Sequence, residues 1–186
     1  NIYNNIIHES NYVGINIDFG NNINITGNTI YNHTYGIKLS QSSSQLPFVV
    51  EDNIIFDSNI GIWSVQNRVY INRNIIYNNS DGIVFEINKY DTSKIINNTV
   101  YNNYNGIRFA QGECEPIEII NNSVTSNYYG IRIDSGWSDF SYCNSIIANN
   151  NSWDNDSGNN YFEYGDDLPD GTGNMTNTNI NGNVCD

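Results

Sequence analysis

Basic residues are scarce in this chain. It has seven Lys and Arg against 20 Asp and Glu, which gives a formal net charge of −13 over 186 residues. Nucleic-acid binding depends on clustered Lys and Arg that displace counterions, so this composition disfavours a nucleic-acid partner. It disfavours an anionic membrane surface for the same reason. The acidic excess confers solubility and leaves cations as plausible companions.

Cysteine and long apolar runs are scarce too. The three cysteines, Cys114, Cys143 and Cys185, are too few for a disulfide scaffold and fit no zinc motif. They allow one disulfide and a leftover thiol in an exported protein, with the pairing open. No run is long and apolar enough to cross a bilayer, and no signal-like leader is present, so we expect no membrane insertion. Because the first residues are already repeat-like, we expect this chain to be part of a longer one.

The helix formers Ala, Leu, Glu and Lys are few, while Asn, Ile and Tyr abound. β-Branched and aromatic residues fall in short alternating runs, which is typical of strands. One sequence motif recurs along the chain. Its copies are residues 98–109 (NTVYNNYNGIRF), 28–39, 53–64, 74–85 and 122–133, with a looser copy at 5–17 and a decayed one near 144.

A glycine recurs in these copies at intervals of 22, 25, 21, 24 and 24 residues, at Gly14, Gly36, Gly61, Gly82, Gly106 and Gly130. Such a period indicates stacked repeats. Each repeat holds three short strands, so we predict an all-β fold, a single-stranded parallel β-helix of about six to seven coils. Parallel crossovers favour the right-handed form. The repeats cover residues 1–151, and residues 152–186 are predicted to be a non-repetitive segment of loops or a cap.

Two repeated residue types have structural roles in this prediction. The glycine precedes an inward Ile, where positive φ or a close backbone approach favours Gly. The leading Asn, one per coil, can form a hydrogen-bonded ladder. We expect no chemistry from either. The ladder residues are Asn28, Asn53, Asn74, Asn98 and Asn122.

Residues 1 to about 150 resemble the right-handed parallel β-helix repeat proteins, with their N-x-I-x-x-N-x-x-x-G-I-x-φ pattern. That group includes pectate-lyase-like domains, NosD-type periplasmic proteins and microbial surface proteins. The Asn- and Tyr-rich style is similar to the methanogen disaggregatases, which break down a chondroitin-like surface polymer. The resemblance implies a polysaccharide ligand and an extracellular or cell-surface location. It transfers no catalytic motif, because the matching positions are core and turn positions.

Alternation predicts which residues of the Gly-Ile-x-φ-x strand face outward. The first outward column is Asn16, Lys38, Trp63, Val84, Arg108, Arg132, and the second is Asp18, Ser40, Val65, Glu86, Ala110, Asp134. Glu86 and Asp134 would flank Ala110 about 9 to 10 Å apart at the backbone. That separation is compatible with an inverting glycosidase pair beside Arg108 and Arg132. The alternative is that these four residues are surface ion pairs.

The spacers after these strands add further candidates. Lys89 or Lys94 could act as the base of a lyase, with the two arginines as neutraliser and acid. Substrate-binding candidates are Trp137, Trp63, Lys38, Lys89, Lys94, Tyr90 and Asp139. We expect no required cofactor and no defined metal site. Calcium is an alternative neutraliser, held by Glu113, Glu115 and Glu118 or by the Asp/Gly segment 166–174.

Two hypotheses and a weaker third follow from these patterns. The first is a polysaccharide hydrolase or lyase, with its groove along Glu86, Arg108, Arg132 and Asp134. The second is a non-catalytic surface module whose coils associate end to end, since no N-terminal cap is recognisable. The third is an adhesin that uses the same groove without turnover. His8 and His33 fit no catalytic triad, and no nucleotide-binding or nucleophile motif is present.

Overall fold

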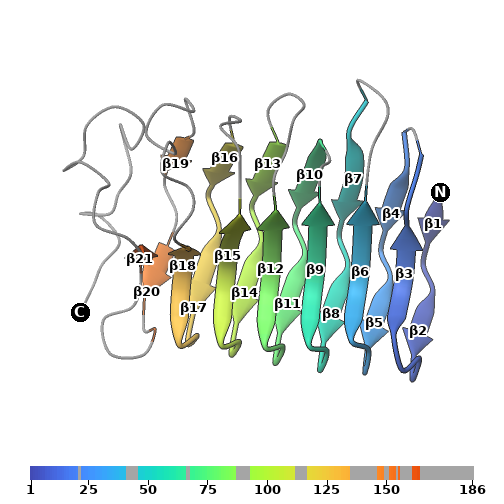
Figure 1. The fold of residues 1–186 in the computed structure, drawn as a ribbon, viewed down its shortest axis with the longest axis horizontal. Coiled ribbons are helices and arrows are strands. Elements are labelled where there is room, and N and C mark those ends of the chain that lie inside the picture. The colour runs from blue at the N-terminus through green and yellow to red at the C-terminus, as the bar shows by residue number, and fades with distance from the viewer. Residues whose placement is uncertain are drawn as a thin grey trace.

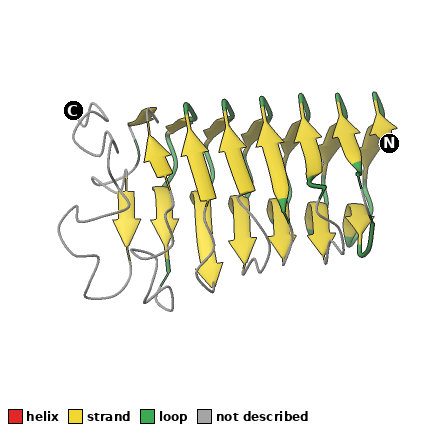
Figure 2. Cartoon of the chain, turned by 90° about the horizontal axis from the view of Figure 1, so that it is seen from above, coloured by secondary structure: helices red, strands yellow, loops and turns green. Residues whose placement is uncertain are grey.

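The computed structural model describes residues 1–20, 22–40, 46–65, 68–86, 93–111, 117–134, 146–148, 151–153, 155 and 161–163. In these ranges every regular element is a strand (Figure 2). The strands form three seven-stranded sheets, in which every neighbouring pair is parallel. Figure 1 shows the coils stacked side by side from β1 to β21. The predicted all-β parallel β-helix with three strands per coil is therefore confirmed.

Each coil contributes one strand to each sheet, named A, B and C in chain order. Sheet A contains β1 (Ile2–Tyr3), β4 (Asn24–Thr26), β7 (Phe48–Glu51), β10 (Val69–Asn72), β13 (Ser93–Ile96), β16 (Ile117–Ile120) and β19 (Ile146–Ala148). Sheet B contains β2 (Ile6–His8), β5 (Thr29–Tyr31), β8 (Ile54–Phe56), β11 (Ile75–Tyr77), β14 (Thr99–Tyr101), β17 (Ser123–Thr125) and β20 (Asn151–Trp153). Sheet C contains β3 (Val13–Ile17), β6 (Tyr35–Ser40), β9 (Ile60–Val65), β12 (Asp81–Glu86), β15 (Asn105–Gln111), β18 (Tyr129–Ile133) and β21 (Tyr161–Glu163).

The core is a set of aliphatic columns inside the coil. Sheet A contributes Ile71, sheet B Ile76 and sheet C Ile83 to one coil, and each is fully buried. Equivalent residues lie directly above and below them, because the register matches repeat to repeat. Burial of such a column drives the folding of each coil onto its neighbour.

The corner between sheets A and B carries the predicted asparagine ladder. From Asn5 to Asn122, the side-chain amide and the backbone N–H of each residue donate to the Oδ1 of the next, at 2.9–3.0 Å. The same amides donate to backbone carbonyls of the corner, as Asn98 does to Ile71 and Ile96. From Asn28 to Asn122 these asparagines are buried, whereas Asn5 in the first coil is exposed, so along most of its length the ladder satisfies backbone groups that water cannot reach. The ladder prediction is confirmed.

A second ladder occupies the corner between sheets B and C, and the sequence analysis missed it. Asn79, Asn103, Asn127 and Asn155 are linked by amide and backbone bonds of 2.9–3.1 Å. In earlier coils the same place is filled by Ser58 and by other residues. It was overlooked because only the later coils carry asparagine there.

His33 fills the second-ladder position of its coil. Its Nδ1 lies 3.0 Å from the carbonyl oxygen of Ser10, and its Nε2 lies 3.2 Å from that of Ile7. The imidazole is buried and both of its nitrogens face backbone oxygens of the preceding coil. It is therefore a structural substitute for the ladder asparagine.

The repeated glycines are needed for close approach. A Cβ on Gly82 would lie 2.5 Å from the carbonyl oxygen of Gly106 and 2.8 Å from the Val100 side chain. Positive φ instead falls on the residue just before each ladder position, such as Arg73 (φ 53°), Asn97 (φ 58°) and Asn78 (φ 55°). Of the two expected reasons for glycine, close approach is the one that holds.

The last described strands extend the sheets past the expected repeat boundary. β20 pairs with β17, and β21 pairs with β18. The division at residues 151/152 stays a prediction, because residues 164–186 lie outside the described part. No helix in the described ranges is long and apolar enough to cross a bilayer.

Candidate functional site on the outward face of sheet C

The outward face of sheet C carries the column that the sequence analysis singled out. Strand pairing places Asn16, Lys38, Trp63, Val84, Arg108 and Arg132 in one register, each beside the next. Three of the seven Lys and Arg in the chain thus share a column on adjacent or nearby rungs. The predicted register of the first column is confirmed, but Val84 in its middle is buried, at 2% exposed.

The N-terminal half of this face is an aromatic patch with a cation over it. Tyr35 and Trp63 stack with centroids 4.8 Å apart and planes 19° apart. The Lys38 ammonium lies 5.0 Å from the Trp63 centroid and 5.9 Å from that of Tyr35. All three side chains are half-buried. A cation held at this distance from an indole face is stabilised by the ring quadrupole.

The C-terminal half is a ring of ion pairs built by β12, β15 and β18. The two oxygens of Asp134 accept from different arginines: Oδ2 from Arg108 at 2.7 and 2.9 Å, and Oδ1 from Arg132 at 2.6 Å. Arg132 also donates to Asn105 at 3.3 Å, and Asn105 donates to Asp81. Arg108 lies 3.6 Å from Asp81, which closes the ring. The repulsion between arginines on adjacent rungs is thereby offset.

Burial is the main influence on the pKa of Asp81, one of the two carboxylates in this ring. Asp81 is only 9% exposed. Burial raises the pKa of its carboxyl above the ordinary value, while the Asn105 hydrogen bond and the charge of Arg108 work against that rise without cancelling it. For Arg108, burial opposes the charge, but the hydrogen bond and charge of Asp134 outweigh it, so the pKa of Arg108 lies above its ordinary value.

The second outward column departs from prediction at Ala110. The register shifts between Phe85 and Glu86, so that Glu86 pairs with Gln111. Ala110 therefore does not lie opposite Glu86, as a regular strand would place it. A β-bulge has this effect because it adds one residue to one strand of the pair.

Lys94 lies on another face. It sits on β13 of sheet A, and its ammonium is 2.7 Å from the Glu118 carboxylate of β16. The expectation that Lys94 extends the sheet C region is therefore wrong in position, because the chain re-enters sheet A before residue 94. Glu118, one of the expected calcium ligands, is instead the partner of this lysine.

Several predicted residues lie outside the described part. They are Lys89, Tyr90, Trp137, Asp139, Glu113, Glu115, the segment 166–174, and the three cysteines Cys114, Cys143 and Cys185. Among the residues that the structure does describe, no group of three or more His, Cys, Asp or Glu side chains is arranged to hold a metal ion.

The sequence analysis missed the residue that precedes the repeated glycine. This position faces outward and supplies Tyr35, Asp81, Asn105 and Tyr129 to the site, in register with one another. Tyr129 lies under Arg132, with its centroid 4.9 Å from the guanidinium carbon. The residue at the position before the glycine changes from coil to coil, and that variability in the sequence could have indicated that the position faces outward.

The architecture and this outward site define a parallel β-helix repeat protein. The family model "Periplasmic copper-binding protein (NosD)" matches residues 1–185, nearly the whole chain. The chain belongs to that family. Comparisons with curated proteins and with solved structures gave no match.

Proposed function

We propose that this chain is an extracytoplasmic β-helix module that binds an acidic glycan along the outward face of sheet C. The main observation behind this proposal is that Lys38, Trp63, Arg108 and Arg132 lie in one outward column, although the chain as a whole has a net charge of −13. Aromatic faces pack against sugar rings, and guanidinium or ammonium groups pair with uronate carboxylates. The periplasmic name of the family supports an extracytoplasmic location.

The ion pairs favour binding over turnover. A general base needs a carboxylate that can reach the substrate. Both oxygens of Asp134 already accept from guanidinium groups at 2.6–2.9 Å. Hydrolysis or elimination by Glu86 and Asp134, with Arg108 and Arg132, stays a prediction for this face. Release of reducing ends that disappears in Glu86→Gln would support cleavage.

Copper, which the family name mentions, is not supported by the described donors. Copper sites in proteins prefer imidazole, thiolate and thioether ligands. Both nitrogens of His33 already face carbonyl oxygens, and His8 is stacked on Tyr31, with its Nδ1 3.7 Å from Glu9. All cysteines and Met175 lie outside the described residues. The described part therefore does not fit a copper centre, and no step is assigned to one.

A structural surface module is the second candidate. The observation that favours it is the closed ring, in which ion pairs join Asp81, Arg108, Asp134 and Arg132, and Asn105 links Arg132 back to Asp81. End-to-end self-association of coils belongs to this alternative and stays a prediction. Calcium binding likewise stays a prediction. Glu118 is no longer a candidate ligand for it, because its carboxylate is paired with Lys94.

Binding of oligogalacturonate to the full chain, measured by isothermal titration calorimetry, tests the proposal. Lys38→Ala should weaken binding about tenfold, the effect of losing roughly 1.4 kcal/mol. Arg73→Ala is the matched control, since it also removes one cation but lies at the corner of sheets A and B, paired with Asp52 at 2.8 Å. Equal losses in both variants, or no binding by the wild type, would contradict the proposal and favour the structural module.

A further inference from the structure

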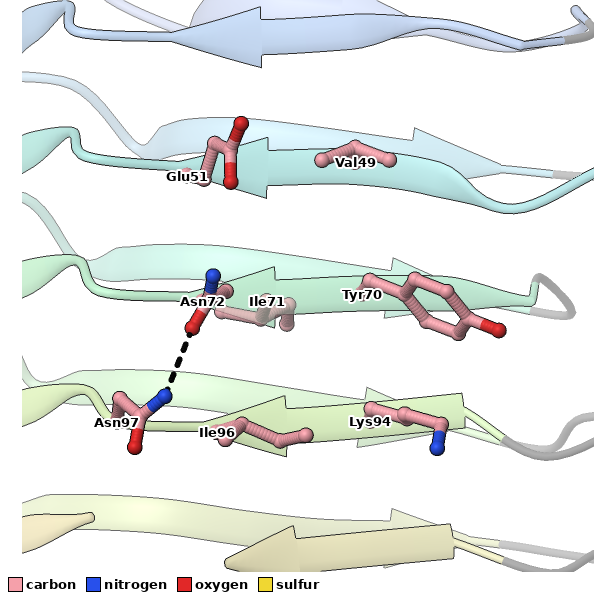
Figure 3. Close-up of a pocket in the computed structure, with 8 residues that line it drawn as sticks. All are labelled: Val49, Glu51, Tyr70, Ile71, Asn72, Lys94, Ile96 and Asn97. Atoms are coloured by element: carbon pink, nitrogen blue, oxygen red, sulfur yellow. Dashed lines mark hydrogen bonds between the residues drawn. The ribbon is translucent and has the colours of Figure 1, made fainter. Parts of the chain in front are cut away.

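The outward face of sheet A contains a hollow that the proposed function does not use. It has a volume of about 280 Å³ and crosses three neighbouring strands, β7, β10 and β13. Figure 3 shows its lining: Val49, Glu51, Tyr70, Ile71, Asn72, Lys94, Ile96 and Asn97. This volume is slightly below the range of about 300–1,000 Å³ typical of drug-sized ligands, so it suits one or two ring-sized groups.

Tyr70 is held in place at one side of this hollow. The Arg68 guanidinium donates to its hydroxyl at 3.0 Å and lies 5.7 Å from the ring centroid. The Lys94 ammonium lies 5.9 Å from the same centroid and is itself fixed by Glu118 at 2.7 Å. The half-buried ring is thus positioned before any ligand arrives, which lowers the ordering cost of binding.

The opposite side of the hollow is polar. The Asn97 amide donates to Asn72 Oδ1 at 3.2 Å across adjacent rungs (Figure 3). Glu51 stands on the next rung and accepts from Arg73 at 3.0 Å. Amide and carboxylate groups have capacity for more than one hydrogen bond each. Val49 lies beside Tyr70 in register and Ile96 lies beside Asn72, and both supply aliphatic surface at outward positions of their strands.

The charges around the hollow cancel locally. Lys94 is matched by Glu118, and Arg73 pairs with both Glu51 and Asp52, each within 3.0 Å. Arg68, beside Tyr70, is the third cation and brings the sum of these charges to zero. No net field therefore selects an ion of either sign at this place. The strands here are interior to their sheet, so a peptide cannot add by strand pairing.

We propose that this hollow binds a neutral sugar unit. A pyranose has one apolar C–H face and a rim of hydroxyls. These match the fixed Tyr70 ring with Val49 beside it on one side, and the Asn72, Asn97 and Glu51 groups on the other. The site lies on a different sheet from the proposed acidic-glycan face and takes a ligand of different charge, so it stands independently of that proposal.

The test uses cellobiose, maltose and N,N′-diacetylchitobiose, titrated separately into the full chain and followed by protein NMR or calorimetry. We expect at least one to bind. Tyr70→Ala and Asn72→Ala should each weaken that binding about tenfold, while Tyr70→Phe retains most of it because the ring remains. Tyr104→Ala is the matched control, since Tyr104 is 50% exposed and stacks on Tyr128, outside the lining of the hollow.

The melting temperature of each variant separates loss of binding from loss of fold, and Asn72→Ala keeps the test valid if Tyr70→Ala unfolds. The inference is overturned if none of the three disaccharides binds, or if both alanine variants bind like the wild type. Oligogalacturonate binding should be unchanged in Tyr70→Ala. The failure of either proposal can thus be told from the failure of the other.

Discussion

At the scale of single residues, position in the coil decides whether a polar side chain is structural or available for binding. Asn98 is buried and bonded on every side, whereas Arg108, ten residues later, faces outward. Asp81 stands between these cases, because it is outward in register yet only 9% exposed. Its titration is therefore the most informative property of the ring.

Asp81→Asn should alter the pH dependence of stability. Burial raises the pKa of Asp81 in the folded protein, so the folded state takes up this proton before the unfolded state does. The wild type should then gain stability relative to the variant as pH falls from neutral toward the ordinary carboxyl value of 3.8. Urea titrations of the wild type and Asp81→Asn at several pH values give the free energy of unfolding of each protein, and the difference between the two values measures this gain.

A difference between wild type and Asp81→Asn that does not change with pH would contradict this account. Asp52→Asn is the contrasting variant, because the hydrogen bond that Arg73 donates lowers the pKa of the Asp52 carboxyl. The wild type should therefore lose stability relative to Asp52→Asn as the pH falls below the ordinary carboxyl value of 3.8, the opposite sign from Asp81→Asn.

At the scale of elements, the two corner ladders and the aromatic stack of sheet B hold the coils in register. On sheet B the rings of His8, Tyr31, Phe56, Tyr77 and Tyr101 stack outward at centroid separations of 4.9–5.1 Å. That spacing follows from the distance of about 4.8 Å between neighbouring strands. Stacked side chains on the outside and amides at the corners therefore enforce the same register as the core.

Asn98→Ala should destabilise the protein by about 3 kcal/mol or more, because it leaves several buried donors and acceptors without partners. The Asn98 side chain accepts from Asn74 and donates to Asn122 and to the Ile71 and Ile96 carbonyls. Asn59→Ala, at an exposed turn position, should stay within about 0.5 kcal/mol of the wild type. Chemical denaturation measures the free energy of unfolding of both variants. A loss in Asn98→Ala as small as that in Asn59→Ala would mean that the ladder is dispensable.

At the scale of the whole molecule, the sequence predicted the solenoid well because its repeat encodes geometry. Gly106, Ile107 and Asn98 recur at positions that only a stacked coil explains, and the structure places them accordingly. The site was less predictable. Alternation correctly placed Arg108 beside Arg132, but it could not reveal the register shift after Phe85, which moves Ala110. Nor could it show that Asp134 bridges both arginines, since that depends on side-chain conformation.

The proposed glycan face has a length that can be tested. Lys38 on β6 and Arg132 on β18 are separated by four rungs. At about 4.8 Å per rung this is roughly 19 Å, the length of a short oligosaccharide.

The most direct measurement is the affinity of the full chain for oligogalacturonates of increasing length. The account predicts that affinity rises with each added sugar and levels off near four units, and that Lys38→Ala removes the rise at the longest lengths. Affinity independent of length, or no binding at any length, would contradict it.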